Sequence, residues 1–170
     1  MWEILKLVSN LASSLDCSLY LVGGTIRDKL LGHDPQDIDL AVSGSCQSLA
    51  ELLAKELQGT VVLMDQERET VRVVVQPNIQ IDLSLLKGNC IERDLLTRDF
   101  TINALAIKLS DFNNEWINKV IDPLGGLQDI KLGLLRAVSN SSLLDDPLRF
   151  YGEFAWLPAT ICPYFPLPVY

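Results

Sequence analysis

The chain has 170 residues, of which 48% are hydrophobic and 21% charged, and this balance excludes disorder as its main state. Its 22 acidic residues outnumber the 14 basic ones, and the net charge of -8 argues against a surface that binds nucleic acid through bulk electrostatics. Any contact with RNA must then be local, or belong to a part of the protein outside this chain.

Several classes of protein are disfavoured by the pattern of the chain. No apolar run approaches the roughly 18 residues that span a bilayer, and the first residues do not resemble a signal peptide. The 4 cysteines are far apart, which favours free thiols in a cytosolic protein over a zinc site or a redox motif. The single histidine, His33, excludes a histidine-based triad and a multi-histidine metal site.

The start of the chain is expected to alternate helices and strands. Apolar residues recur at helical spacing over 4–15, and a short apolar strand is predicted over 19–22. Gly23 and Gly24 form the turn that follows this strand. A short helix then begins, and Gly32 ends it in the usual C-terminal position.

An antiparallel meander is predicted in the middle of the chain. Before it, a strand is expected over 37–42, and Ser45 is a plausible cap for a helix with a stripe of core leucines. Charged and proline-containing turns separate three further strands, which are expected over 60–64, 70–75 and 79–86.

Asp37 and Asp39 form the pair that points most directly to chemistry. Side chains of a strand alternate, so both carboxylates should share one face while Ile38 and Leu40 enter the core. A divalent cation is the usual way to hold two such carboxylates ionised, and Mg²⁺ commonly combines one or two of them with substrate phosphates. Magnesium and phosphate are therefore the working hypothesis. Asp82, on the third strand of the meander, is either a third carboxylate beside Asp37 and Asp39 or an exposed residue of an edge strand without a role.

A second dense stretch of polar residues runs from 92 to 107. A helix starting near Asp99 would put Asp99 and Asn103 on one face, with Phe100 and Ala104 on the core side. Arg98 at its start could hold a phosphate. Taken alone, Arg98 and Asp99 could equally be a cap and a surface ion pair worth under about 1 kcal/mol.

Four segments follow one another over about residues 15–150: LVGGTIRDKLLGHDPQDIDLAV, DLLTRDFTINALAI, IDPLGGLQDIKLGLLRAV and DDPLRF. In this order they resemble the catalytic head of the bacterial (class II) tRNA nucleotidyltransferase and poly(A) polymerase family. The resemblance implies an α+β fold, a polymerase-beta-like head with a mixed or antiparallel sheet flanked by helices. It implies a head domain over 1–140 and the start of a helical neck over 141–156.

The implied reaction is metal-dependent, template-independent addition of CMP or AMP, from CTP or ATP, to the 3′ end of an RNA. The RNA is expected to be tRNA, whose CCA end is made or repaired, or a substrate of polyadenylation. In the family's reaction the terminal hydroxyl attacks the α-phosphate and pyrophosphate leaves. Two Mg²⁺ ions bridged by Asp37 and Asp39 would activate the hydroxyl and neutralise charge.

The resemblance also implies a nucleotide site. Gly23 and Gly24 would let the backbone and the following helix N-terminus approach the triphosphate, and Arg27 would offer it a fork of donors. A simple glycine turn would explain the glycines but not Arg27. Asp28 is expected to orient its neighbours. Contacts with the triphosphate and the ribose are implied for Arg98, Asp99 and Asn103.

Asp146 and Arg149 match the pair that reads the Watson–Crick edge of the incoming base in the family. They would share one face of a helix, and a plain intrahelical ion pair is the alternative because Gly152 replaces a repeated family arginine. Residues 157–170 carry four prolines and no charge, so a helix cannot continue there. We expect an aberrant tail from a truncated or frame-shifted product, with a naturally minimal enzyme as the alternative.

Two function hypotheses follow from the sequence. The first is an active nucleotidyltransferase head, and the second is a truncated, non-catalytic remnant that at most binds Mg²⁺ and nucleotide. The short connection over 83–97 resembles enzymes that add only part of the CCA end, or poly(A) polymerases, rather than enzymes that add all three nucleotides.

Overall fold

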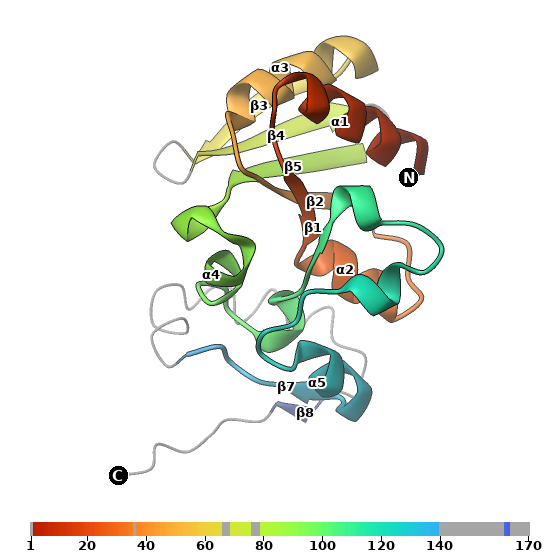
Figure 1. Cartoon of the computed structure of the whole chain (residues 1–170), viewed down its shortest axis with the longest axis vertical. Coiled ribbons are helices and arrows are strands. Elements are labelled where there is room, and N and C mark those ends of the chain that lie inside the picture. The colour runs from red at the N-terminus through yellow and green to blue at the C-terminus, as the bar shows by residue number, and fades with distance from the viewer. Residues whose placement is uncertain (1, 36, 66–68, 76–78, 140–161, 164–170) are drawn as a thin grey trace.

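A mixed six-stranded sheet forms the centre of the protein, with strands in the order β3-β4-β5-β2-β1-β6 (Figure 1). The computed structural model describes residues 2–35, 37–65, 69–75, 79–139 and 162–163. The strands are β1 Leu19–Val22, β2 Asp37–Val42, β3 Thr60–Asp65, β4 Thr70–Val75, β5 Ile79–Leu85 and β6 Ala106–Lys108. The α+β fold expected from the sequence is confirmed.

Pairing between strands is antiparallel except at the centre of the sheet, where β2 and β5 run parallel. The predicted meander is confirmed, because β3 pairs with β4 and β4 pairs with β5. The parallel pair places Asp39 directly beside Asp82. Of the two alternatives for Asp82, a place beside the carboxylate pair is confirmed, and an edge strand is wrong, since β5 lies between β4 and β2.

Helices α1 Trp2–Ser14 and α3 Cys46–Leu57 cover one face of the sheet (Figure 1). Their apolar sides form the main core with every second residue of the central strands. The predicted cap of α3 is confirmed, because the Ser45 side chain accepts a hydrogen bond from the backbone N–H of Ser48. Capping of this kind satisfies one of the N–H groups that a helix start leaves unpaired.

The opposite face of the sheet carries shorter elements. A second cluster of buried residues on this face includes Ala41 of β2 and Leu95. The elements that follow β1, β5 and β6 in the chain are α2 Gly24–Leu30, η1 Lys87–Asn89, α4 Ile91–Leu95, η2 Thr101–Asn103, η3 Leu109–Asp111, η4 Trp116–Lys119 and α5 Gly126–Leu132. Of these, η3 contacts α1, and its Leu109 belongs to the main core. A small parallel pair joins β7 Leu134–Leu135 to β8 Cys162–Pro163.

The prediction of a helix starting near Asp99 was wrong. Phe100 is extended and pairs with Ala137 through an isolated β-bridge, and the N–H of Thr101 donates to the carbonyl of Arg136 at 2.9 Å. Only the 3₁₀ turn η2 forms there. Pairing with a segment that lies far along the chain therefore overrides the local helical pattern.

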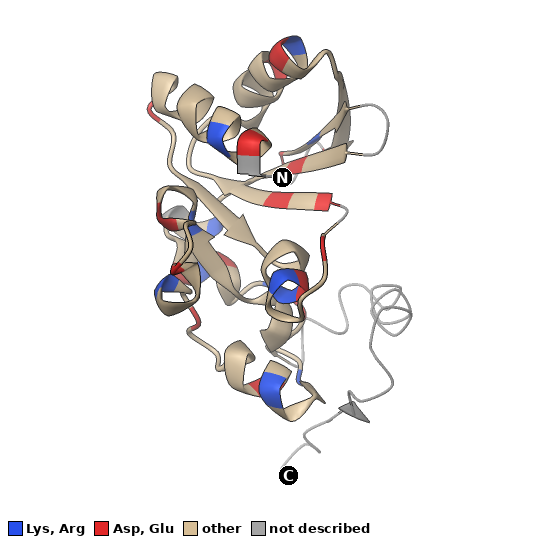
Figure 2. Cartoon of the chain, turned by 90° about the vertical axis from the view of Figure 1, so that its right-hand side faces the viewer, with Lys and Arg blue, Asp and Glu red and all other residues tan. Residues whose placement is uncertain are grey.

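Charged residues are spread over separate helices, strands and loops of the described chain, and the Lys and Arg positions do not gather on one element (Figure 2). Within the described residues, no helix has both the length and the apolar character needed to cross a membrane. Cys17, Cys46 and Cys90 are free thiols, as the sequence predicts.

Candidate active site

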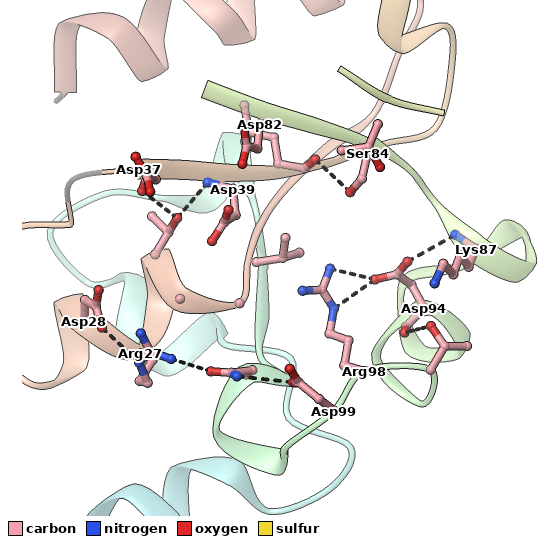
Figure 3. A pocket seen from close by; sticks show the side chains of 18 of the residues that line it. Arg27, Asp28, Asp37, Asp39, Asp82, Ser84, Lys87, Asp94, Arg98 and Asp99 are labelled. Carbon is pink, nitrogen blue, oxygen red and sulfur yellow. Dashed lines mark hydrogen bonds and ion pairs between the residues drawn. The ribbon is translucent and has the colours of Figure 1, made fainter. Parts of the chain in front are cut away.

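A cavity of about 740 Å³ opens on the sheet face opposite α1 and α3, between β2, β5, α2 and the segment that follows α4 (Figure 3). Of the residues predicted for the site, those that line it are Gly23, Gly24, Arg27, Asp28, Asp37, Asp39, Asp82, Arg98, Asp99 and Asn103. The candidate base readers Asp146 and Arg149 lie outside the described residues. The structure brings together side chains from α2 and η2, which lie far apart in the sequence.

Asp37 and Asp39 point to the cavity because β2 alternates its side chains. Ile38 and Leu40 are 3% and 1% exposed and lie in the main core, as the sequence predicts. On the N-terminal side of Leu40, β1 no longer pairs with β2, and the hydroxyl of Thr25 bonds to the β2 backbone instead. Thr25 Oγ1 accepts a hydrogen bond from the Asp39 N–H at 2.7 Å and donates to the Asp37 carbonyl at 3.2 Å.

The environment of Asp39 disfavours its ionised form. Burial and, after it, the charge of Asp82 raise the pKa of Asp39 to about 6, whereas the charge of Arg98 and a hydrogen bond from the Thr25 backbone oppose the shift. An isolated carboxylate in such a place loses solvation without gaining a full partner. Asp39 is thus a position where a bound cation would restore the ionised state.

Asp82 already has a partner. Arg72 on β4 lies opposite it in the sheet and binds it with both ends of its guanidinium, Nε to Oδ1 at 2.6 Å and Nη2 to Oδ2 at 2.7 Å. Asp82 holds the pKa of Arg72 above its ordinary value through this hydrogen bond. Both carboxylate oxygens of Asp82 are therefore engaged, and Asp37 and Asp39 remain the better donors for a cation.

The glycine doublet keeps the space beside Asp39 open. Gly23 has φ of 61°, and a β-carbon there would lie 3.0 Å from Arg98 Nη1 and 3.6 Å from Asp39 Oδ2. A β-carbon on Gly24 would lie 3.4 Å from the same Asp39 oxygen. Side chains at these positions would occupy volume between the carboxylate and the arginine, and the turn itself needs a positive φ that glycine adopts freely.

Arg27 is held by a chain of hydrogen bonds across the cavity. Its Nε donates to Asp28 Oδ1 at 2.9 Å, and its Nη1 donates to Asn103 Oδ1 at 2.7 Å. Asn103 Nδ2 in turn donates to Asp99 Oδ1 at 3.2 Å. Asp99 and Asn103 therefore meet, although through the turn η2 rather than along the predicted helix.

Arg98 follows α4 instead of starting a helix, and Asp94 orients it. Arg98 Nε and Nη2 both donate to Asp94 Oδ2, at 3.1 and 2.9 Å. Asp94 is buried, and its other oxygen accepts a hydrogen bond from the backbone N–H of Lys87 at 3.2 Å. The guanidinium is thus fixed at the wall of the cavity before any ligand arrives, which lowers the entropic cost of binding an anion.

Sequence reasoning missed three residues that support the site: Thr25, Arg72 and Asp94. Asp94 lies four residues before Arg98, a spacing at which side chains of a helix meet, so this pair carried a local signal. Arg72 could have been found from the register of the meander, which sets it opposite Asp82. Thr25 carried no such signal, because its partners belong to a strand that the local sequence does not place beside it.

The chain matches the family model of the Poly A polymerase head domain over residues 19–136. A CC-adding tRNA nucleotidyltransferase of Geobacter sulfurreducens is 35% identical over 150 residues, which cover 88% of this chain and 34% of that protein. An A-adding tRNA nucleotidyltransferase of Deinococcus radiodurans is 40% identical over 129 residues, or 76% of this chain and 27% of that protein. The chain thus spans about a third or less of these curated relatives.

Solved structures of CCA-adding enzymes are also similar to this chain. The Thermotoga maritima CCA-adding enzyme complexed with tRNA superposes with a TM-score of 0.74 at 34% identity, covering 89% of this chain and 36% of that one. A CCA-adding enzyme in complex with CTP superposes with a TM-score of 0.73 at 34% identity, covering 86% and 36%. With a match over residues 19–136, relatives of 35% and 40% identity and two solved structures of the same fold, the chain belongs to the Poly A polymerase head-domain family.

Proposed function

We propose that this chain is the catalytic head of a metal-dependent RNA nucleotidyltransferase that adds CMP or AMP to the 3′ end of tRNA without a template. The observation that carries the proposal is that one cavity is lined both by the carboxylate pair Asp37 and Asp39 and by two held arginines, Arg27 and Arg98. Carboxylates that attract a cation beside guanidinium groups that attract phosphate make a site suited to a nucleoside triphosphate with its metal.

The donor set fits Mg²⁺. Asp37 and Asp39 would hold the cation, and the remaining ligands would come from phosphate and water, as is common for this ion. In keeping with such sharing, the described residues contain no cluster of three or more His, Cys, Asp or Glu side chains suited to a metal. When bound, Mg²⁺ would supply charge neutralisation at the reacting phosphate and favour the ionised form of the attacking hydroxyl.

The remaining residues would bind and orient the nucleotide. Arg27 and Arg98 are proposed to hold the triphosphate oxygens, while Asp99 and Asn103 would accept and donate hydrogen bonds at the ribose. The 3′ hydroxyl of the RNA would form a bond to the α-phosphorus as the bond to the β-phosphate oxygen breaks and pyrophosphate leaves. Fixed donors along the cavity would lower the barrier because they need not reorganise during the reaction.

The base that is added stays a prediction. Both CC-adding and A-adding enzymes occur among the relatives, so CTP and ATP are both proposed substrates. Asp146 and Arg149 remain the proposed readers of the base. A cytoplasmic location is likewise proposed from tRNA as the substrate.

The direct test incubates the purified chain with tRNA lacking its 3′ end, Mg²⁺ and labelled CTP or ATP. Incorporation is expected for the wild type and for Asp111→Asn, whose exposed carboxylate pairs with Lys119 away from the cavity. Asp37→Asn is expected to abolish incorporation while nucleotide binding persists. Nucleotide binding without incorporation by the wild type would overturn the catalytic proposal and leave a non-catalytic domain that binds nucleotide.

A further inference from the structure

Thr25 is buried at the start of α2, and its hydroxyl makes one donated and one accepted hydrogen bond to the backbone of β2. The side chain is 1% exposed. Its Oγ1 accepts from the Asp39 N–H at 2.7 Å and donates to the Asp37 carbonyl at 3.2 Å. Figure 3 draws both contacts as dashed lines beside Asp37 and Asp39. A hydroxyl has one hydrogen to donate, so the roles of the two partners are fixed.

The two hydrogen bonds of Thr25 take the place of backbone pairing with β1, which ends before it reaches Asp39. The last register pair between β1 and β2 is Leu21 with Leu40, and the chain then turns away at Gly23 into α2. In a strand, residues two apart direct their N–H and C=O groups to the same edge, so Asp37 and Asp39 share the edge that β1 leaves open. The hydroxyl of Thr25 thus pairs the backbone of both carboxylate-bearing residues where no strand does.

The same hydroxyl joins the two halves of the cavity. Thr25 lies on α2 between Gly24, whose missing β-carbon leaves room at Asp39, and Arg27, which is held toward Asn103. The distance between the carboxylates and the guanidinium therefore depends on how α2 is fixed to β2.

We propose that Thr25 is a positioning residue, whose hydroxyl sets the place of Asp37 and Asp39 relative to α2 and thereby the affinity of the pair for a divalent cation. The inference rests on the proposed function in that it takes these carboxylates as the cation's ligands. Mutation of a partner that orients a metal ligand typically costs about 10–100-fold in metal affinity. A hydroxyl that served only to cap a helix or fill the core would alter stability and leave cation binding unchanged.

The test compares Thr25→Val, which keeps the shape and loses the hydroxyl, with Thr25→Ser, which keeps the hydroxyl. Mn²⁺ alone serves as the probe, and its binding to the full chain is measured by electron paramagnetic resonance. Thr25→Val is expected to weaken Mn²⁺ binding by about tenfold or more, while Thr25→Ser stays close to the wild type. The Mg²⁺ concentration that half-saturates nucleotide transfer should rise in parallel, with little change in the KM for nucleotide.

A second buried hydroxyl provides the control. Thr101 is 3% exposed and donates to Asp129 at 2.5 Å, away from Asp37 and Asp39, so Thr101→Val should lower stability without changing Mn²⁺ affinity. Mn²⁺ binding by Thr25→Val equal to that of the wild type would overturn the inference. If circular dichroism shows that Thr25→Val is unfolded, Thr25→Ala is compared with Thr25→Ser in the same way, and equal affinities overturn it again. A wild type that transfers no nucleotide, yet loses Mn²⁺ affinity on Thr25→Val, would remove the proposed reaction and keep this inference.

Discussion

Asp39 is a buried carboxyl group whose ionised form is disfavoured by its surroundings. Its backbone is held by Thr25, and its carboxylate lies beside Asp82 in the parallel strand pair. Burial and this neighbour raise its pKa to about 6, well above the value of an exposed aspartate. A folded protein that keeps such a group ionised at neutral pH loses stability, and a bound divalent cation would restore it.

Asp39→Asn is therefore expected to stabilise the metal-free protein at pH 7.5 while abolishing nucleotide transfer. Because the folded-state pKa lies above the unfolded value of 3.8, the wild type loses stability as the pH rises from about 4 to about 6. The neutral amide escapes this loss, which amounts to about 2–3 kcal/mol at most. Urea unfolding from pH 4 to pH 8 measures the difference, and the two proteins should converge near pH 4.

Magnesium should reverse the order of the two proteins. Addition of Mg²⁺ at pH 7.5 is expected to raise the unfolding midpoint of the wild type and to leave that of Asp39→Asn nearly unchanged. A wild type that is the more stable protein at pH 7.5 without metal would contradict the raised pKa of Asp39.

The register of the central strands places three charged side chains next to one another. Parallel pairing of β2 with β5 sets Asp39 beside Asp82, and antiparallel pairing of β5 with β4 sets Asp82 opposite Arg72. The register thus makes a row of three charges, negative, negative and positive, on the face that bears the cavity. Arg72 balances the charge of Asp82, and its removal would leave two neighbouring carboxylates without a full counter-charge.

Opposite shifts in pH dependence are expected from changes at Asp82 and at Arg72. Asp82→Asn removes a charge that raises the pKa of Asp39, so the acid limb of the rate–pH profile should move to lower pH. Arg72→Met strips Asp82 of its partner, so the acid limb should move to higher pH. Single-turnover rates measured from pH 5 to pH 8 give the acid limb of each variant.

Arg93→Met serves as the control for loss of an arginine, because Arg93 lies exposed on α4 outside the cavity lining. Its profile should match that of the wild type. Shifts of Asp82→Asn and Arg72→Met in the same direction would show that the row of charges does not set the pKa of Asp39.

At the scale of the whole molecule, the segment around α5 fixes the turn that carries Asn103. Asp122 caps α5 by accepting hydrogen bonds from the backbone N–H groups of Gly126 and Leu127 at 2.8 and 2.9 Å. The fully buried Asp129 binds Thr101 and Arg136, so α5, η2 and the segment that follows β7 are joined through one carboxylate. A site built on β2 and α2 is completed in this way from a distant part of the chain.

Gly126→Ala is expected to destabilise the protein by about 2–3 kcal/mol, because a β-carbon there must displace backbone. It would lie 2.1 Å from the Thr101 carbonyl oxygen, and a backbone group cannot turn away as a side chain can. Gly125→Ala is the matched control. Gly125 has open space around it and a φ of 78°, so alanine should cost only about 1 kcal/mol of backbone strain. Urea unfolding that ranks Gly125→Ala as the more damaging change would contradict the close packing of α5 on η2.

Much of the local structure could be predicted because it depends on neighbours in sequence. The strand that bears Asp37 and Asp39 alternates as expected, Ser45 caps α3, and the charged and proline-containing turns produce the meander. The prediction failed at Asp99, where pairing of Phe100 with Ala137 replaced the expected helix. It failed also for the strand of Asp82, because strand order in a sheet is not a local property.

The sequence by itself determined the kinds of chemistry available: a carboxylate pair on one face of a strand, a glycine doublet and arginines near anion-binding turns. Period and spacing suffice for these, since each depends on a few adjacent residues. Only the tertiary structure decided that Arg72 pairs with Asp82 and that Asp94 accepts hydrogen bonds from Arg98. It also decided that the Thr25 hydroxyl bonds to the β2 backbone where β1 no longer pairs with it. These contacts depend on where the chain ends one strand and enters the next, and that is settled by the packing of the whole domain.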